Sequence, residues 1–370
     1  MRVVVGTGGT AGHVFPAVAA AERLRDRLGV EVDFLGRADG LEARLVPQAG
    51  FPMRTVEALP FARKVSLTTL RAPFAALRAA QRCRPVIRGA DAVLGMGGYV
   101  SVPVSLAARR EGVPLVLHEQ NAIPGLANRL ASRWARAVAL SFPGSGDRFP
   151  RRTRTVVTGN PVRGSVLRVR DGRDALRHEG FRRLELDPSR TTVVAFGGSQ
   201  GARKLNRATV VACGVLADRA DLQVVVLTGS GHHAEVVEGL ADRGNLLVRA
   251  RAFLDEMELA YAVADLVVCR AGATTVAEVT ACGLPAVMIP YPYATAHHQD
   301  ANASAVVRSG GAVVIPDGEL DGQILAERIR DLVDDRERLV AMARGSAAFG
   351  RPDAADALAD LTAEVAGARV

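Results

Sequence analysis

The chain carries, twice, an apolar strand that runs directly into a glycine loop. VVVGTGGTAGH occupies residues 3–13 and VVAFGGSQGA occupies residues 193–202. When a helix starts right after such a loop, its first N–H groups are unpaired donors at the positive end of the helix dipole, and they favour a bound phosphate. One such unit in each half of the chain predicts two similar domains that bind a phosphorylated ligand.

Apolar segments alternate with helical patterns through both halves, which is typical of parallel sheets covered by helices. In the first half we predict strands at Arg2 to Val5, Val32 to Leu35, Ala92 to Leu94, Leu115 to Leu117 and Ala137 to Leu140. In the second half we predict them at Thr192 to Phe196, Gln223 to Leu227, Leu246 to Arg249, Leu266 to Cys269, Ala286 to Ile289 and Ala312 to Ile315. The predicted fold class is α/β, with two Rossmann-like doubly wound domains that face a cleft.

The domain boundaries follow from turn chemistry and from the C-terminal pattern. The Asn-Pro turn of GNPVR (159–163) predicts the junction. Apolar residues on one face of the Ala-rich C-terminal segment predict a closing helix. We therefore predict a first domain of residues 1–159 plus the helix 345–370, and a second domain of residues 160–344. Ligands of doubly wound sheets bind at the carboxyl ends of the strands, so the cleft is the candidate active site.

Composition excludes several classes of protein. No apolar run approaches the roughly 20 residues that span a bilayer, so we expect no transmembrane helix. The first strand begins at Arg2, which leaves no room for a signal peptide and predicts a cytoplasmic protein. The four cysteines lie far apart without a CxxC spacing, which argues against a zinc site or a disulfide framework.

Charge is distributed unevenly along the chain. Residues 1–165 hold 24 Arg and Lys against 11 Asp and Glu, whereas the remainder holds 23 against 28. No acidic residue lies between Glu57 and Asp91. The basic residues there are interleaved with apolar ones: Arg63, Lys64, Arg71, Arg78, Arg82, Arg84 and Arg88 among Phe61, Val65, Leu67, Leu70, Phe74 and Leu77.

This basic-apolar segment, residues 58–90, predicts a surface that docks on an anionic membrane. The alternative is that its apolar side chains only pack a helix onto the sheet. Nucleic acid is not an expected partner, because the segment lacks aromatic stacking residues and any recognised binding motif.

Residues 265–302 have the order expected of a nucleotide-sugar site. A strand leads into a Gly-Ala-Thr-Thr turn and a helix that carries Glu278, and a second apolar run then leads to His-His-Gln-Asp. Glu278 can accept hydrogen bonds from both ribose hydroxyls. The alternative is an ordinary βαβ unit in which Gly272 and Gly283 only make turns.

The same motifs bear on two other ligand classes, metal ions and dinucleotides. His297, His298 and Asp300 have no standard metal-ligand spacing, so no metal site is predicted. GTGGTAGH matches the dinucleotide fingerprint GxGxxG only in part, and the second strand ends at Arg37 without the acid that binds the NAD ribose. Since an arginine suits a 2′-phosphate, an NADP enzyme stays as an alternative.

Seven motifs in order carry a resemblance that covers nearly the whole chain. They are GGTAGHVFPA (8–17), GMGGYVSVP (95–103), HEQNAIPG (118–125), GNPVR (159–163), GGSQGA (197–202), RAGATTVAE (270–278) and HHQDANA (297–303). Together they resemble the MurG family of bacterial peptidoglycan N-acetylglucosaminyltransferases, which have the GT-B fold.

The resemblance implies an activity, a location and the absence of a cofactor. The activity is transfer of N-acetylglucosamine from UDP-N-acetylglucosamine to the 4-hydroxyl of lipid I, an undecaprenyl-diphosphate muramyl-pentapeptide, which gives lipid II with inversion at the anomeric carbon. The protein would act as a peripheral protein on the cytoplasmic face of the bacterial cell membrane.

Inversion in one step needs a base near the acceptor hydroxyl and a group that stabilises the departing UDP. His13 ends the first glycine loop at a helix start, and its imidazole can accept a proton near neutral pH. Glu119 of HEQN is the rival base. Arg163 fits the diphosphate, because its charge is permanent and its fork matches paired oxygens.

The resemblance also places substrate-binding residues. They are Thr10, Ala11, Gly12, Asn121, Arg163, Ser199, Leu254, Ala273, Thr274, Thr275, Val276, Ala277, Glu278, Gln299 and Asn302. Ala11 stands where the family most often has glycine. His298 stands where it often has glutamine, which leaves that contact open.

Two further functions remain compatible with this architecture. One is a UDP-N-acetylglucosamine 2-epimerase, which would need buried carboxylates around the donor sugar and no lipid-facing surface. The other is a non-catalytic nucleotide-sugar-binding protein that docks on membranes. Substitution of His13 or Glu119 by alanine separates that second function from a transferase, because only a transferase would lose turnover while it still binds the donor.

Overall fold

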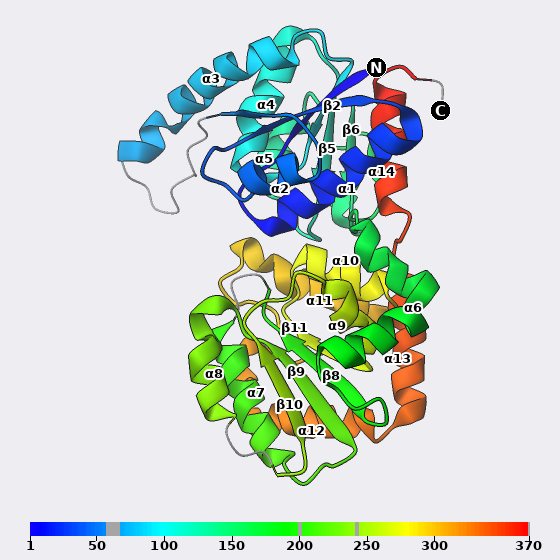
Figure 1. The fold of residues 1–370 in the computed structure, drawn as a ribbon. Coiled ribbons are helices and arrows are strands. Elements are labelled where there is room, and N and C mark those ends of the chain that lie inside the picture. Colours follow the sequence, from blue (N-terminus) through cyan, green and yellow to red (C-terminus); the bar gives the residue numbers. More distant parts are fainter. Residues whose placement is uncertain (57–66, 199–201, 241–243, 369–370) are drawn as a thin grey trace. The chain divides into compact units, whose positions relative to one another are not determined.

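A computed structural model describes residues 1–56, 67–198, 202–240 and 244–368 of the chain (Figure 1). It divides into two compact units, which we call unit 1 (Met1–Arg163 with Pro352–Val370) and unit 2 (Gly164–Arg351). Relative to the boundaries expected from the sequence, residues 160–163 lie in unit 1 and residues 345–351 lie in unit 2.

In the described part of unit 1, seven parallel strands form a sheet in the order β3-β2-β1-β4-β5-β6-β7. The strands are β1 (Arg2–Gly6), β2 (Glu31–Gly36), β3 (Met53–Thr55), β4 (Ala92–Gly95), β5 (Leu115–Glu119), β6 (Ala137–Leu140) and β7 (Thr155–Val157). The helices are α1 (Ala11–Leu28), α2 (Glu42–Gln48), α3 (Leu67–Ile87), α4 (Gly98–Glu111), α5 (Leu126–Ala131), the 3-10 turn η1 (Ser145–Arg148) and α14 (Ala354–Val365). The five strands predicted for this half are confirmed.

Helices cover both faces of the unit 1 sheet (Figure 1). Successive side chains of a strand point to opposite faces, so Val3 and Val5 of β1 pack with Leu358 of α14 on one face. Val4 packs with Ile87 of α3 on the other. The run Val3–Val5 is therefore apolar throughout because both faces of the strand are buried there.

In the described part of unit 2, six parallel strands follow the order β10-β9-β8-β11-β12-β13. The strands are β8 (Thr191–Phe196), β9 (Leu222–Leu227), β10 (Leu247–Arg251), β11 (Leu266–Cys269), β12 (Ala286–Met288) and β13 (Ala312–Val314). The helices and 3-10 turns are α6 (Gly164–Arg183), α7 (Arg203–Val215), η2 (Ser230–His232), α8 (His233–Gly239), α9 (Met257–Val263), α10 (Ala273–Ala281), η3 (Thr295–His297), α11 (His298–Arg308), η4 (Asp317–Glu319), α12 (Gly322–Val333) and α13 (Arg336–Phe349). All six strands predicted for this half are confirmed.

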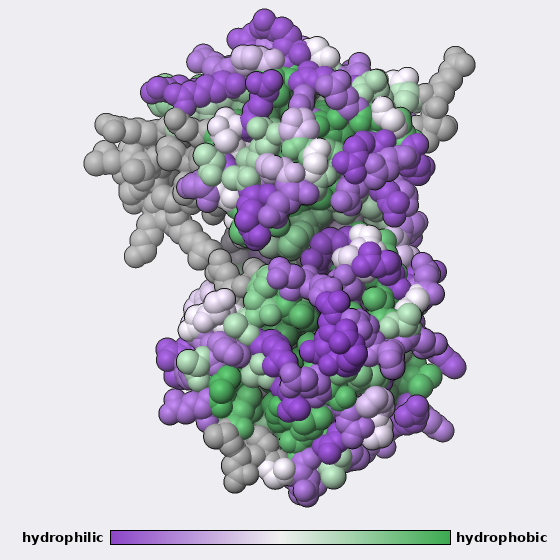
Figure 2. All heavy atoms as spheres, in the orientation of Figure 1, coloured by the Kyte–Doolittle hydropathy of each residue, from purple (hydrophilic) through white to green (hydrophobic). Residues whose placement is uncertain are grey.

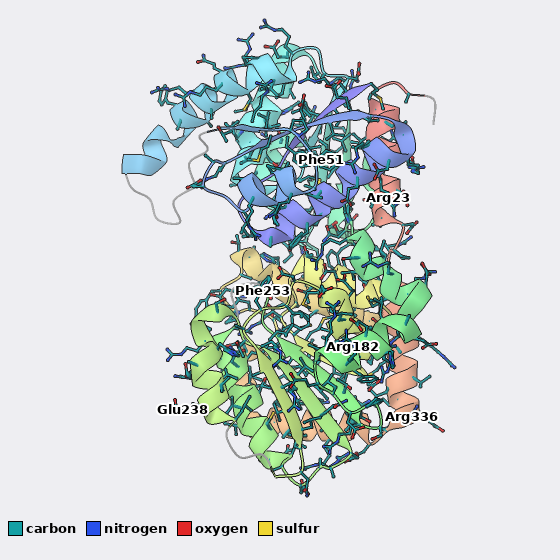
Figure 3. The ribbon with its side chains drawn as sticks, in the orientation of Figure 1. Arg23, Phe51, Arg182, Glu238, Phe253 and Arg336 are labelled. Atoms are coloured by element: carbon teal, nitrogen blue, oxygen red, sulfur yellow. The ribbon has the colours of Figure 1, made fainter. Side chains whose placement is uncertain are left out.

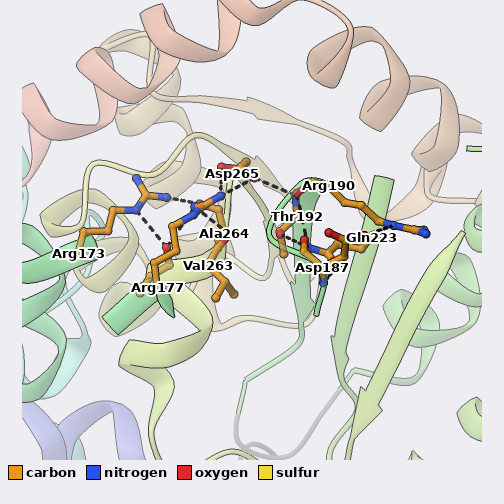
Figure 4. Close-up of polar contacts among 10 residues, drawn as sticks. Arg173, Arg177, Asp187, Arg190, Thr192, Gln223, Val263, Ala264 and Asp265 are labelled. Atoms are coloured by element: carbon orange, nitrogen blue, oxygen red, sulfur yellow. Dashed lines mark hydrogen bonds and ion pairs between the residues drawn. The ribbon is translucent and has the colours of Figure 1, made fainter. Parts of the chain in front are cut away.

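Two arginines of α6 fasten that helix to the end of α9 in unit 2 (Figure 4). Arg173 and Arg177 donate to main-chain carbonyls of residues 262–264, which lie in the last turn of α9 and just beyond it. Arg177 also pairs with Asp265 at 3.1 Å, and Asp265 accepts the N–H of Thr192 at 2.8 Å. Burial lowers the pKa of Arg173. These contacts join the amino ends of β8 and β11. They therefore stabilise the sheet at the end of its strands opposite the glycine motifs.

None of the described helices combines the length and the apolarity that crossing a membrane requires.

Candidate active site

The glycine motifs occupy corresponding places in the two units. In unit 1 the strand order reverses between β1 and β4, and in unit 2 it reverses between β8 and β11. The first glycine loop follows β1 and the GMGG turn follows β4, while GGSQGA follows β8 and RAGATTVAE follows β11. Reversal of strand order is where open α/β sheets bind ligands at the carboxyl ends of their strands. Each unit therefore has one candidate site.

His13 lies in the first turn of α1 and is held by its own loop. Its Nδ1 lies 3.1 Å from Oγ1 of Thr10, and its carbonyl accepts from Oγ1 of Thr7 at 3.1 Å. The imidazole faces the GMGG turn, because a methyl group added at Gly97 would lie 3.1 Å from His13 Cδ2. Thr10 is exposed, whereas Ala11, Gly12 and His13 are half-buried. The ring is thus fixed between the ends of β1 and β4.

Glu119 lies at the end of β5 and organises the loop that follows. Its Oε1 accepts the N–H of Asn121 at 3.0 Å. Its Oε2 accepts from the N–H of Gly125 at 3.1 Å and from Nδ2 of Asn128 at 2.9 Å. The side chain is 3% exposed, and burial raises the pKa of the carboxyl group. Both oxygens are engaged within the HEQNAIPG loop, and Asn121 is half-buried beside them.

His118 connects β5 to the GNPVR segment. Its Nε2 lies 3.0 Å from the carbonyl oxygen of Gly159 and 3.3 Å from Oγ of Ser141. Since a carbonyl only accepts, this geometry assigns the ring proton to Nε2. The side chain is fully buried, and burial lowers the pKa of His118 to about 4. A neutral imidazole therefore braces the segment that leads to Arg163.

Arg163 is the last residue of unit 1, and its guanidinium lies 4.3 Å from the ring centroid of Phe15 in α1. A guanidinium over an aromatic face is attracted by the ring and is held in one orientation. Phe15 is two residues beyond His13. The structure thus brings two predicted site residues, His13 and Arg163, to the same helix end.

In unit 2 the predicted donor cradle is the start of α10. Gly272 is the N-cap residue, and as a glycine it makes no side-chain capping hydrogen bond. Ala273 and Val276 are buried, and Thr274, Thr275 and Ala277 are half-buried. Glu278 is 5% exposed, and its Oε2 accepts from the hydroxyl of Tyr261 at 2.9 Å. Tyr261 belongs to α9, and no sequence pattern indicated that it would contact Glu278.

The predicted sugar-binding amides brace the loops around this cradle. Asn302 is fully buried, and its Nδ2 donates to the carbonyl of Ala271 at 3.1 Å. Oε1 of Gln299 accepts the N–H of Tyr291 at 3.0 Å. Nδ1 of His298 lies 2.8 Å from the carbonyl of Thr295, and burial lowers its pKa.

A second polar network next to the cradle was missed from the sequence. Arg270, 8% exposed, donates through Nη1 to the carbonyls of Ile289 and Pro290 at 3.2 Å each and to Oδ1 of Asp317 at 2.6 Å. Asp317 in turn accepts from Lys204 in the first turn of α7. The network ties the ends of β11 and β12 to η4 and α7. No sequence pattern indicated this network, because its members come from separate segments of the chain.

The remaining predicted residues are distributed as follows. Leu254 is half-buried in the loop between β10 and α9, next to Phe253, which is 55% exposed (Figure 3). Ser199 lies outside the described residues, as does the part of the basic-apolar segment up to residue 66. Within the described part of that segment, Phe74 is 71% exposed.

Across the part of the chain that the structure describes, His, Cys, Asp and Glu side chains form no group of three or more that could hold a metal ion. Nδ1 of His297 lies 3.6 Å from Oδ2 of Asp300, and both side chains are exposed.

Two doubly wound units, each with glycine motifs where its strand order reverses, are the architecture of the GT-B fold, and the family profiles give its class as glycosyltransferase. The sequence profile of the glycosyltransferase family 28 N-terminal domain matches residues 3–140, and that of the C-terminal domain matches residues 192–358. The chain belongs to glycosyltransferase family 28 and is an enzyme.

Individual relatives and one crystal structure are similar to this chain over nearly its whole length. A relative from Halothermothrix orenii is 40% identical over 375 residues, which cover 99% of each chain, and one from Nocardioides is 42% identical over 370 residues, which cover 99% of this chain and 98% of the relative. Both are named UDP-N-acetylglucosamine--N-acetylmuramyl-(pentapeptide) pyrophosphoryl-undecaprenol N-acetylglucosamine transferase. The crystal structure of Acinetobacter baumannii MurG matches with a TM-score of 0.78 at 30% identity, and the match covers 98% of this chain and 99% of that one.

Proposed function

We propose that this enzyme transfers N-acetylglucosamine from UDP-N-acetylglucosamine to the 4-hydroxyl of the muramyl sugar in lipid I, giving lipid II for peptidoglycan synthesis. The observation that carries the proposal is the name shared by relatives that are 40% and 42% identical over nearly the whole chain. The placement of the candidate residues supports it, because each unit offers one half of the chemistry.

Unit 2 is the proposed donor site. The first turn of α10, which begins at Ala273, directs main-chain N–H groups toward the diphosphate, where the helix dipole favours negative charge. Glu278 accepts from the ribose hydroxyls, and its contact with Tyr261 sets the direction of the carboxylate. Leu254 lies near the uracil, whose edge is bound by main-chain atoms.

The amides beyond α10 serve the sugar in different ways. Gln299 is half-buried and reaches the N-acetylglucosamine directly. Asn302 has no exposed surface, so its proposed contribution is to hold the main chain at Ala271, which leads into the cradle. Ser199 of the second glycine loop and Arg163 complete the proposed contacts to the diphosphate.

Unit 1 is the proposed acceptor site, with His13 as the general base. The imidazole takes the proton of the 4-hydroxyl while that oxygen attacks the anomeric carbon from the face opposite UDP. The bond between the anomeric carbon and the phosphate oxygen breaks, and UDP leaves with the electron pair. Arg163 stabilises the charge that develops on UDP. One displacement inverts the anomeric carbon.

We propose that Glu119 organises the acceptor loop and is not the base. A base needs a lone pair directed at the substrate proton, whereas both oxygens of Glu119 accept hydrogen bonds from its own loop. The loop then presents Asn121 to the donor sugar, and Thr10, Ala11 and Gly12 approach it from the first glycine loop.

We further propose that unit 1 docks on the cytoplasmic face of the cell membrane. Leu126 and Leu130 of α5 are 79% and 45% exposed, and Arg129 and Arg133 are exposed beside them. Phe74 of α3 is also exposed, and Figure 2 shows hydrophilic residues along the edge of unit 1 where α3 lies. Exposed apolar side chains among arginines suit the headgroup region of an anionic bilayer.

The test of the reaction uses labelled UDP-N-acetylglucosamine and a short-chain lipid I analogue. We expect a lipid-linked disaccharide with inverted configuration. His13→Ala should lower kcat about 100- to 10,000-fold while UDP binding stays unchanged, because it removes proton transfer only. His178→Ala, an exposed histidine on α6, is the matched control and should leave turnover unchanged. Release of free sugar or an epimer without disaccharide would refute the proposed function.

A further inference from the structure

A buried carboxylate, Glu42, lies directly behind the first glycine loop. Glu42 begins α2 and has no exposed surface. Its Oε1 accepts the N–H of Arg37 at 2.9 Å, and its Oε2 is buried without a hydrogen-bond partner among the described residues. Burying a carboxylate costs free energy unless hydrogen bonds or ion pairs replace the lost hydration. Glu42 therefore contributes neither to solubility nor to a surface ion pair, and its role must lie in the contacts that surround it.

Three glycines from three segments surround this carboxylate. A methyl group added at Gly8 would lie 2.5 Å from Glu42 Oε1, and one added at Gly36 would lie 2.6 Å from its Cγ. One added at Gly40 would overlap both carboxylate oxygens. None of the three has a positive φ, so main-chain conformation does not require glycine at these positions. Their glycines are explained by the close approach of the chain to Glu42.

The opposite side of the same loop is held by the GMGG turn. A side chain at Gly98 would overlap the carbonyl oxygen of Gly8, and Gly98 has a φ of +73°. Gly97 of this turn faces the imidazole of His13. The loop 7–13 is thus confined between Glu42 on one side and residues 97–98 on the other.

We propose that Glu42 is a positioning residue for His13. By fixing Gly8 against the GMGG turn, the carboxylate sets where the loop ends and where the first turn of α1 places the imidazole. Glu42 itself touches no substrate. The inference rests on the proposed role of His13, and a misplacement of about 1 Å in a reacting group costs roughly 100-fold in rate.

The first test is amide hydrogen exchange on the whole enzyme. Glu42→Ala should speed exchange of the residue 7–13 amides about tenfold or more, since the loop loses its support on one side. Glu42→Gln keeps the shape and the Oε1 acceptor, so it should stay within about threefold of the unmodified enzyme. Asp33→Asn is the matched control, because Asp33 is another carboxylate of unit 1, on strand β2, and it pairs with Arg2 at 2.6 Å. If Glu42→Ala does not fold, Glu42→Asp, which withdraws the carboxylate by one methylene, replaces it. Unchanged exchange at residues 7–13 in a folded variant would overturn the proposal.

The second test asks whether Glu42 acts through His13. Glu42→Ala should lower kcat about 10- to 100-fold and leave the Kd for UDP unchanged. In a His13→Ala background the same substitution should cost nothing further, whereas a residue that only stabilises the fold gives additive losses. Additive losses would therefore refute the positioning role. If His13→Ala alone keeps full turnover, the proposed base is wrong, and the exchange measurement still decides whether Glu42 holds the loop.

Discussion

At the scale of single residues, buried polar groups carry most of the information about the site. Glu119, His118 and Glu278 are each at most 5% exposed and each has a defined hydrogen-bond partner. A buried polar group that is well paired fixes the segments that pair with it. The loops of the candidate site are thus held in position by hydrogen bonds to buried carboxyl and imidazole groups.

His118 gives a pH dependence of stability with a definite sign. Its pKa is about 4 in the folded protein, below the ordinary 6.5, so the unfolded chain binds a proton first as the pH falls. The stability that comes from keeping His118 neutral is complete above pH 6.5 and is lost as the pH falls toward 4. Between pH 8 and pH 5 this group should cost about 2 kcal/mol of unfolding free energy.

Urea denaturation of the unmodified protein and of His118→Gln at both pH values measures this loss. Glutamine still donates to Gly159 but does not titrate, so the variant should lose about 2 kcal/mol less than the unmodified protein. Burial raises the pKa of Glu119, which acts in the opposite direction, but that contribution is common to both proteins. Equal losses in both proteins would show that His118 is not the responsible group.

At the scale of elements, the strands with a continuous apolar run were predictable, and two short edge strands of unit 1 were not. The eleven strands predicted from the sequence are all present. The structure adds β3 and β7, each of three residues at an edge of the unit 1 sheet. These two strands are partly solvated and too short to show a pattern, so their pairing depends on the neighbouring strand rather than on their own residues.

The contacts between α6 and α9 predict that a substitution lowers stability only on the face of α6 that packs on α9. Arg177→Met should lower the unfolding free energy of unit 2 by about 1–3 kcal/mol, because it removes the ion pair with Asp265 and the guanidinium donor to the carbonyl of Val263. Ala262 still accepts from Arg173, and Asp265 still accepts the N–H of Thr192. Thermal and urea unfolding measure the change.

Arg182→Met on the same helix is the matched control for that substitution. Arg182 pairs with Glu179 at 2.7 Å, but its side chain is 66% exposed (Figure 3). An exposed pair of this kind contributes little, so unfolding should hardly change. A loss equal to that of Arg177→Met would show that the buried carbonyl contacts are not what matters.

At the scale of the whole molecule, the charge asymmetry matches the proposed roles of the two units, with membrane docking in unit 1 and donor binding in unit 2. Residues 1–165, which include nearly all of unit 1, carry the excess of arginine and lysine, and the remainder carries an excess of acid. A positive excess attracts the unit to an anionic bilayer and orients it, while apolar side chains supply contact at short range.

Membrane docking through unit 1 is tested by sedimentation with anionic phospholipid vesicles. Combining Phe74→Ser with Leu126→Ser should weaken binding about tenfold, because two exposed apolar side chains no longer enter the headgroup region. High salt should weaken binding of the unmodified protein as well. Val211→Ser, an exposed apolar residue on α7 of unit 2, is the control and should bind as the unmodified protein does. Unchanged binding of the double variant would place the docking surface elsewhere.

The α/β class, the two similar halves, the positions of the long strands along the chain and the family could be predicted from the sequence, because apolar periodicity and contiguous glycine motifs are local features. The tertiary structure decided which side chains meet. Tyr261 on Glu278, Lys204 on Asp317, and Glu42 behind Gly8 are pairs from different elements. Such pairs depend on how strands and helices pack, and packing brings together residues whose separation along the chain carries no signal.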